Sequence, residues 1–74
     1  GLKSSEQGNA QFRRSIYAVA DIPAGAPLDR GNIRVIRPGH GLAPRHLPDV
    51  LGRPAKAAIP RGTPITFDLL GDKA

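Results

Sequence analysis

Apolar residues in this chain form short clusters between turns, and their pattern predicts strands more than helices. Residues 15–23 (SIYAVADIP) are rich in β-branched and aromatic side chains and end at a proline, which is typical of a strand. Residues 32–38 (NIRVIRP) alternate Ile33 and Val35 with Arg34, and this alternation predicts a second strand.

Two weaker elements come next in the chain. Residues 53–60 (RPAKAAIP) predict a third, alanine-rich strand. In residues 46–52 (HLPDVLG), three apolar side chains recur at helical spacing before a glycine that stops a helix. We therefore expect one or two helical turns that begin near Pro44.

The most informative pattern is an internal repeat. The stretch DIPAGAPL (residues 21–28) returns 37 positions later as AIPRGTPI (residues 58–65). Each copy is followed by a residue that can cap a helical turn, Asp29 in the first and Thr66 in the second. Because neither half can bury its own apolar face, we predict that the two pack around a pseudo-twofold axis. The expected fold class is mostly β, with short 3₁₀ or α turns.

The composition changes near residue 12. Residues 1–11 (GLKSSEQGNAQ) are small and polar with one leucine, which is typical of a flexible arm. We therefore expect a flexible linker at residues 1–12 and one domain at residues 13–72. A linker at this edge predicts that the domain is attached to something upstream.

Size and composition exclude several classes of protein. The 74 residues suffice for one small domain, and the chain has no cysteine for a disulfide or a thiolate–metal site. No apolar run approaches the roughly 20 residues of a membrane span, and no signal-peptide pattern opens the chain. The sequence therefore predicts a soluble, cytoplasmic protein without a membrane partner.

The chain is basic, with 11 Lys and Arg against 6 Asp and Glu and a formal net charge of +5. This balance favours an anionic partner. However, the arginines are spread along the chain without a run, and only Phe12, Tyr17 and Phe67 could stack on bases. Nucleic acid is therefore not the partner we expect.

The segment VIRPGHGLAP (residues 35–44) holds the strongest candidate site. Proline fixes φ and glycine permits positive φ, so Pro38, Gly39 and Gly41 would give this loop a single path. Arg37 stands at the start of the loop, and its guanidinium offers five donors in a fixed fork for carbonyl or carboxylate acceptors. We therefore expect the loop to present Arg37 to a ligand.

Four motifs occur in order between Arg13 and Leu70: RRSIYAVADIPAGAPL, NIRVIRPGHGLAP, VLGRPAKAAIPRGTPI and FDLL. Together they resemble the C-terminal antifreeze-like domain, or SAF domain, of sialic acid synthases and of relatives in spore coat polysaccharide biosynthesis. The resemblance implies the β-clip fold, which fish type III antifreeze proteins share.

The resemblance also implies a function. In these synthases an N-terminal (β/α)₈ barrel condenses phosphoenolpyruvate with N-acetylmannosamine or a related acetamido sugar, using a divalent metal. The antifreeze-like domain is not catalytic by itself; it swaps across a homodimer and caps the partner's barrel. An arginine of the family's R-P-G-x-G loop reaches toward the sugar's N-acetyl group, and the matching residue here is Arg37. No cofactor is expected in this domain, since the metal belongs to the barrel.

The sequence indicates a binding or catalytic role less strongly for the other candidate residues. His40 lies in the same loop, where a sugar contact and a plain surface role are both open. His46 is expected to be a solvated residue of the short helix, and two histidines without a third ligand do not predict a metal site. Arg13 and Arg14 either anchor the domain to its neighbour or belong to a frayed terminus. No nucleophile–base pair or carboxylate pair is visible, so no catalytic residue is expected.

Two alternatives of other classes remain. A SAF module of pilus or flagellar assembly would act in the periplasm, although the R-P-G-x-G loop and the FDLL motif favour the synthase. An ice-binding domain would need a flat, weakly hydrated face. Asp21, Asp29 and Arg30 are strongly hydrated and break such a face here. The positions that match the face of the fish proteins are Ala20, Asp21, Ala24, Gly25, Ala26, Pro27, Asp29, Arg30, Gly31 and Asn32.

Overall fold

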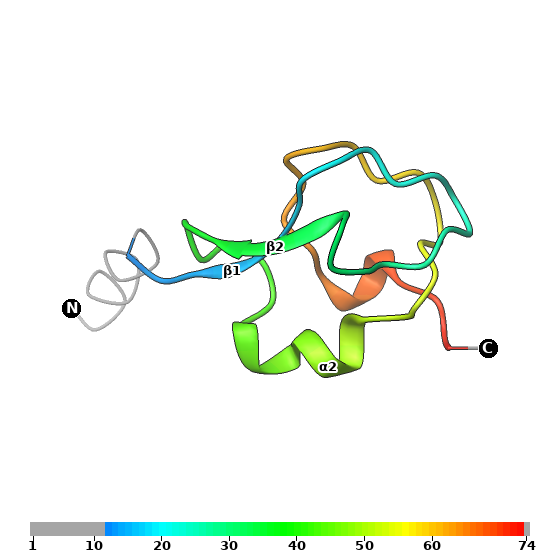
Figure 1. Ribbon diagram of the computed structural model, residues 1–74. Coiled ribbons are helices and arrows are strands. Elements are labelled where there is room, and N and C mark those ends of the chain that lie inside the picture. Colours follow the sequence, from blue (N-terminus) through cyan, green and yellow to red (C-terminus); the bar gives the residue numbers. More distant parts are fainter. Residues whose placement is uncertain (1–11, 74) are drawn as a thin grey trace.

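The computed structural model describes residues 12–73. The polar arm, and with it almost all of the predicted linker, lies outside the described residues. No helix in residues 12–73 is long and apolar enough to span a bilayer. The elements, in chain order, are β1 (Ser15–Ala18), β2 (Ile33–Ile36), the 3₁₀ helix η1 (Pro44–His46), α2 (Leu47–Val50) and the 3₁₀ helix η2 (Phe67–Leu69) (Figure 1).

β1 is the central strand. It pairs antiparallel with β2, where Ile16 lies opposite Val35. On its other edge, the amide of Ile65 donates to the carbonyl of Ile16 (2.9 Å), and the amide of Gly62 donates to the carbonyl of Ala18 (2.8 Å). Because neighbours cover both edges, all four residues of β1 are buried.

Both predicted strands form, but they are shorter than expected. β1 ends at Ala18 rather than at residue 23, and β2 covers four residues rather than residues 32–38. β1 stops where the chain bends at residues 19–20. β2 stops shortly before Pro38, which lacks the amide hydrogen that a ladder requires.

The third predicted strand, at residues 53–60, is wrong. The segment bends at residues 56–57 and makes isolated bridges in place of a ladder. Prolines at positions 54 and 60 cannot donate to a neighbouring strand, which limits each contact to a single bridge. The bridges join Pro54 with Pro27, Ala55 with Leu70, and Ile59 with Ile22.

The predicted helical turns form where expected, as η1 and α2 from Pro44 to Val50. Gly52 comes after them with φ +88°, a left-handed conformation that glycine adopts readily at the end of a helix. Its amide donates to the carbonyl of Leu28 (2.8 Å), which ties the helix end to the core.

The two predicted caps differ. Asp29 accepts at Oδ1 from the amides of Gly31 (2.8 Å) and Asn32 (3.1 Å), as a cap should, although the next turn does not become a helix. The hydroxyl of Thr66 instead donates to the carboxylate of Asp68, and η2 forms without a side-chain cap. Thr66 therefore occupies the predicted N-cap position of η2, but its side chain does not make the capping hydrogen bond.

The predicted pseudo-twofold axis passes between Ile22 and Ile59. The amide of each donates to the carbonyl of the other, and both bonds are 2.8 Å long. Hydrogen bonds away from the axis come in pairs whose members lie 37 positions apart. In one pair, the amide of Ala18 donates to the carbonyl of Thr63, and the amide of Ala55 donates to the carbonyl of Ala26. In another pair, the amides of Val19 and Lys56 donate to the carbonyls of Asn32 and Leu69, respectively.

The core follows the same symmetry. Eight of its apolar residues form pairs related by the axis, and each is at most 3% exposed: Ala18 with Ala55, Ile22 with Ile59, Leu28 with Ile65, and Ile33 with Leu70. Each half contributes one member of every pair, so the two halves build the centre of the core together. This arrangement confirms a small β fold built from an internal repeat.

The symmetry makes a prediction about two glycines. Gly25 and Gly62 occupy matching turns with φ of +84° and +90°, and no atom lies within 4 Å of where a Cβ would stand. Alanine would therefore meet backbone strain alone, at about 1–2 kcal/mol. We expect Gly25→Ala and Gly62→Ala to lower the free energy of unfolding by similar amounts in urea denaturation. Asparagine should cost less at both sites, and a loss at only one site would contradict the symmetry.

Candidate functional site: the arginine loop

Residues 37–42, here called the arginine loop, leave β2 and return to the central strand. The Arg37–Pro38 peptide bond is cis. At the far end of the loop, the carbonyl of Leu42 accepts from the amide of Ile16 (3.0 Å), and the amide of Leu42 donates to the carbonyl of Ile65 (2.8 Å). The loop therefore ends inside the hydrogen-bonding pattern that surrounds β1.

Ser15 holds the middle of the loop. Its Oγ donates to the carbonyl of Pro38 (3.0 Å) and accepts from the amide of Gly41 (3.0 Å). Its side chain lies in the buried interior, where a hydroxyl needs such partners. The sequence pattern predicts Ser15 in a strand but indicates no role for it, because its partners lie 23 and 26 positions away.

Gly41 is required by close packing. A Cβ at this position would stand 2.7 Å from the carbonyl oxygen of Ile16 and 2.9 Å from that of Ile65. Both contacts are with the backbone of central segments, which cannot move aside at low cost. Neither Gly39 nor Gly41 adopts the positive φ on which the sequence argument rested. Glycine is needed at position 41 because a side chain would meet the backbone there.

Arg37 is exposed at the start of the loop. Its Nε donates to the carbonyl of Phe12 (3.0 Å), which precedes β1. Its two terminal nitrogens form no hydrogen bond or ion pair with any residue in the range 12–73. The guanidinium is therefore held along one edge and presents its terminal N–H groups, a geometry suited to a carbonyl or carboxylate acceptor.

The remaining predicted residues lie in different settings. His40 is exposed in the loop, while Pro38 and Gly39 are half-buried. His46 lies in η1 as predicted, but it packs edge-on against Phe67, with ring centroids 5.4 Å apart, and is half-buried rather than solvated. Within residues 12–73, no three His, Asp or Glu side chains come together as a group that could hold a metal ion.

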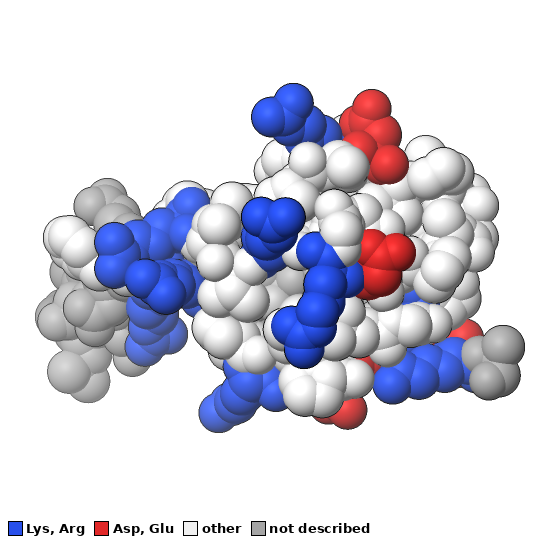
Figure 2. Space-filling model, viewed as in Figure 1, with Lys and Arg blue, Asp and Glu red and all other residues white. Residues whose placement is uncertain are grey.

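The end of the molecule where β1 begins is basic. Figure 2 shows several Lys and Arg side chains gathered there, whereas the acidic side chains visible on this face lie farther along the molecule. Arg13 and Arg14 directly precede β1 and are exposed, and the bond to Phe12 brings Arg37 to the same end. None of the three forms an ion pair with a described carboxylate. Arg37 therefore lies in a surface region that attracts anions.

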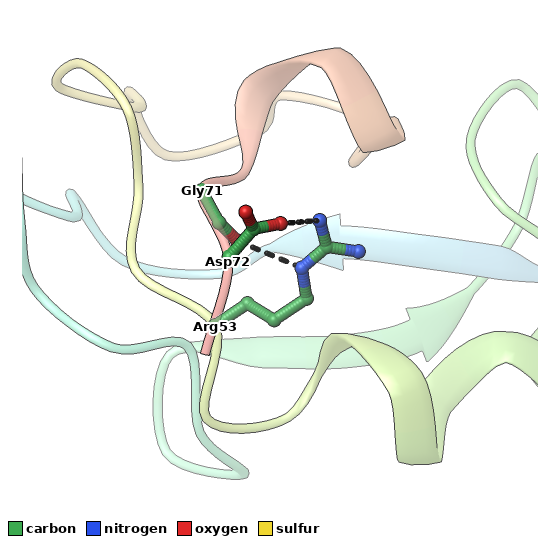
Figure 3. A network of polar contacts seen from close by, with 3 residues as sticks. All are labelled: Arg53, Gly71 and Asp72. Carbon is green, nitrogen blue, oxygen red and sulfur yellow. Dashed lines mark hydrogen bonds and ion pairs between the residues drawn. The ribbon is translucent and has the colours of Figure 1, made fainter. Parts of the chain in front are cut away.

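A second arginine has a different role. Arg53 Nε donates to the carbonyl of Gly71 (2.8 Å; Figure 3). Its guanidinium lies 5.5 Å from the ring centroid of Phe67. A long ion pair of 3.8 Å to the fully exposed Asp72 adds little. These contacts hold the C-terminal segment against the core beside an open hollow of about 460 Å³. The sequence did not indicate the contacts of Arg53, because the acceptor of its hydrogen bond is the backbone carbonyl of a residue 18 positions away.

The family profile of the SAF domain matches residues 13–71. The chain belongs to this family. It is 35% identical over 57 residues to the pseudaminic acid synthase of Helicobacter pylori, a match that covers 77% of this chain and 17% of that enzyme. It is also 37% identical over 54 residues to the pseudaminic acid synthase of Campylobacter jejuni, covering 73% of this chain and 16% of that enzyme. The chain thus matches about one-sixth of the length of these relatives.

Solved structures agree with the fold. The spore coat polysaccharide biosynthesis protein spsE of Bacillus subtilis superposes with a TM-score of 0.78 and 32% identity, covering 100% of this chain and 22% of that one. The antifreeze protein-like domain of human N-acetylneuraminic acid phosphate synthase superposes with a TM-score of 0.72 over 78% of this chain and 75% of that domain. At 20% identity, the human domain supports the fold alone. The expected antifreeze-like fold is confirmed.

The close packing at Gly41 predicts a costly substitution. Gly41→Ala would force a methyl group against two backbone carbonyls, and we expect it to lower the free energy of unfolding by about 1–3 kcal/mol. The control is Gly31→Ala, whose Cβ would meet only the side-chain Oδ1 of Asp29 at 3.1 Å. Urea denaturation of both variants measures the difference. An unchanged midpoint for Gly41→Ala would contradict the packing argument.

Proposed function

We propose that this chain is the SAF domain of a larger synthase that condenses phosphoenolpyruvate with an acetamido sugar, and that Arg37 binds the sugar. The observation that carries the proposal is the arginine loop: it is anchored to the central strand and leaves the terminal nitrogens of Arg37 without a described partner. The similarity to two pseudaminic acid synthases supports a synthase, and the condensation itself is what the family resemblance implies.

The chemistry of Arg37 suits binding rather than proton transfer. A guanidinium stays protonated at any working pH, so it cannot act as a general base. Its terminal N–H groups can donate to the carbonyl oxygen of an N-acetyl group or to a carboxylate. Pro38, Gly39 and Gly41 define the loop without large side chains, which leaves room for a sugar beside the guanidinium. His40 is exposed on the same loop and is a candidate for a second, weaker contact.

The rest of the proposed enzyme lies outside this chain. In the proposal, a (β/α)₈ barrel carries the catalytic residues and holds the divalent metal, and this domain covers the barrel of the partner protomer in a swapped homodimer. The support is that the matched region is a small share of the relatives' length. Synthesis from phosphoenolpyruvate would place the enzyme in the cytoplasm.

The sequence encoded directly upstream of Gly1 tests the assignment. A barrel of about 250 residues would support the synthase. A signal peptide in that position would instead favour an assembly module that acts outside the cytoplasm, and would contradict the proposal.

Arg37→Ala in the full-length enzyme tests the binding role. Loss of a charge-assisted contact to a substrate acceptor costs about 1.5–3 kcal/mol, which corresponds to roughly ten- to more than a hundredfold in kcat/KM for the sugar. The KM for phosphoenolpyruvate should stay close to that of the parent enzyme. Arg37→Lys should recover only part of the loss, because an ammonium cannot reproduce the planar fork. His40→Ala is the matched control in the same loop and should have a milder effect. A folded Arg37→Ala enzyme with normal kcat/KM would refute the role.

The isolated 74-residue chain should have no synthase activity. Residues 12–73 contribute one wall of the proposed pocket and no group that could hold a metal ion. The purified chain, incubated with phosphoenolpyruvate, N-acetylmannosamine and Mn²⁺, is expected to form no condensation product detectable by mass spectrometry. The full-length enzyme under the same conditions, with the acetamido sugar that it accepts, is the positive control. Product formed by the chain alone would show that it contains a catalytic centre.

A further inference from the structure

We infer that Ser15 is a positioning residue for Arg37: its buried hydroxyl holds the arginine loop in the path that presents the guanidinium. This inference rests on the proposed function, since it gives Ser15 a part in the sugar binding assigned there to Arg37.

The environment of Ser15 is the first argument. Its side chain is 1% exposed, and it is the one polar residue in the buried interior of residues 12–73. A buried hydroxyl must find partners, and both partners of this one are backbone groups of the arginine loop. The hydroxyl thereby joins the carbonyl of Pro38 to the amide of Gly41, across the two residues between them. Without it, neither group has another described hydrogen-bond partner.

The position of the anchored groups is the second argument. Pro38 directly follows Arg37, so fixing its carbonyl fixes the peptide next to the arginine. The guanidinium is then held by the carbonyl of Phe12, three positions before Ser15. Of the contacts that restrain Arg37, one therefore comes from the first residue of β1 and the other from the segment just before it. The direction of the arginine depends on how the chain enters the domain.

Amide hydrogen exchange in the 74-residue chain tests the positioning step. We expect Ser15→Ala to speed exchange of the Gly41 amide by about tenfold or more, because its acceptor is removed. It should also increase the mobility of Arg37 Nε–H in ¹⁵N relaxation. Ser15→Cys keeps the shape of the side chain but is a weaker donor, so both readouts should lie between those of the wild type and of Ser15→Ala. The cysteine variant replaces the alanine variant in the experiment if the latter does not fold.

Ile59→Val is the control for stability. Ile59 is buried and its hydrogen bonds go to Ile22 on the pseudo-twofold axis, away from the arginine loop. It should speed exchange of the Ile22 amide and leave Arg37 Nε–H unchanged. If Ser15→Ala gives the same pattern as Ile59→Val, Ser15 stabilises the fold only and the inference is overturned.

A double-mutant cycle in the full-length enzyme tests the link to catalysis. The assay uses phosphoenolpyruvate and the acetamido sugar that the wild-type enzyme turns over. Ser15→Ala should lower kcat/KM for the sugar by about tenfold with an unchanged KM for phosphoenolpyruvate, and should add little to Arg37→Ala. Additive losses would show that Ser15 acts independently of Arg37 and would overturn the inference. If Arg37→Ala alone has no effect, the proposed function fails, while the exchange experiment still decides whether Ser15 orders the loop.

Discussion

Two backbone hydrogen bonds between Ile22 and Ile59 hold the halves of this domain in register. The chain has no cysteine, its strands have four residues each, and its core is small, so no long ladder or covalent link can set the alignment. A shift by one residue at this pair would turn the apolar residues on either side away from the core. The four buried pairs of the core depend on this register, and so do the segments that cover both edges of β1.

The repeat forms the scaffold, and the differences between its two halves form the site. The position that matches Arg37 in the second half is Ala74, so the arginine is not repeated there. Arg34 on β2 is matched by Gly71, whose carbonyl accepts from Arg53. The first half thus continues into a loop that presents an arginine, whereas in the second half Arg53 binds the carbonyl of Gly71. The symmetric core is compatible with this difference because the residues of its buried pairs are not those that form the arginine loop or the contacts of Arg53.

The sequence predicts the pseudo-twofold axis well because each copy of the repeat is one short continuous segment, and the apolar residues of the two copies occupy matching positions. It also indicates a shaped loop at residues 37–42, since proline and glycine follow an arginine there, while the role of Arg37 in binding stays a prediction. The prediction fails at residues 53–60 because it follows the apolar pattern and gives too little weight to the prolines at positions 54 and 60, which interrupt the ladder. It fails at Ser15 and Arg53 for another reason: both bond to backbone groups of distant residues, and a backbone group leaves no trace in the residue types.

Backbone anchoring also determines which residues of the loop are constrained. Ser15 and Leu42 hold the loop through its main-chain groups. The side chain of His40 is exposed, whereas any side chain at Gly41 would meet the backbone of two central segments. An arginine side chain carries roughly 2 kcal/mol of rotamer entropy, part of which a ligand must offset on binding. The bond from Nε to the carbonyl of Phe12 restricts that freedom before any ligand arrives, while the terminal nitrogens stay available. A small domain can therefore offer a preorganised guanidinium because the restraint comes from its central strand and from the segment before it, not from the loop itself.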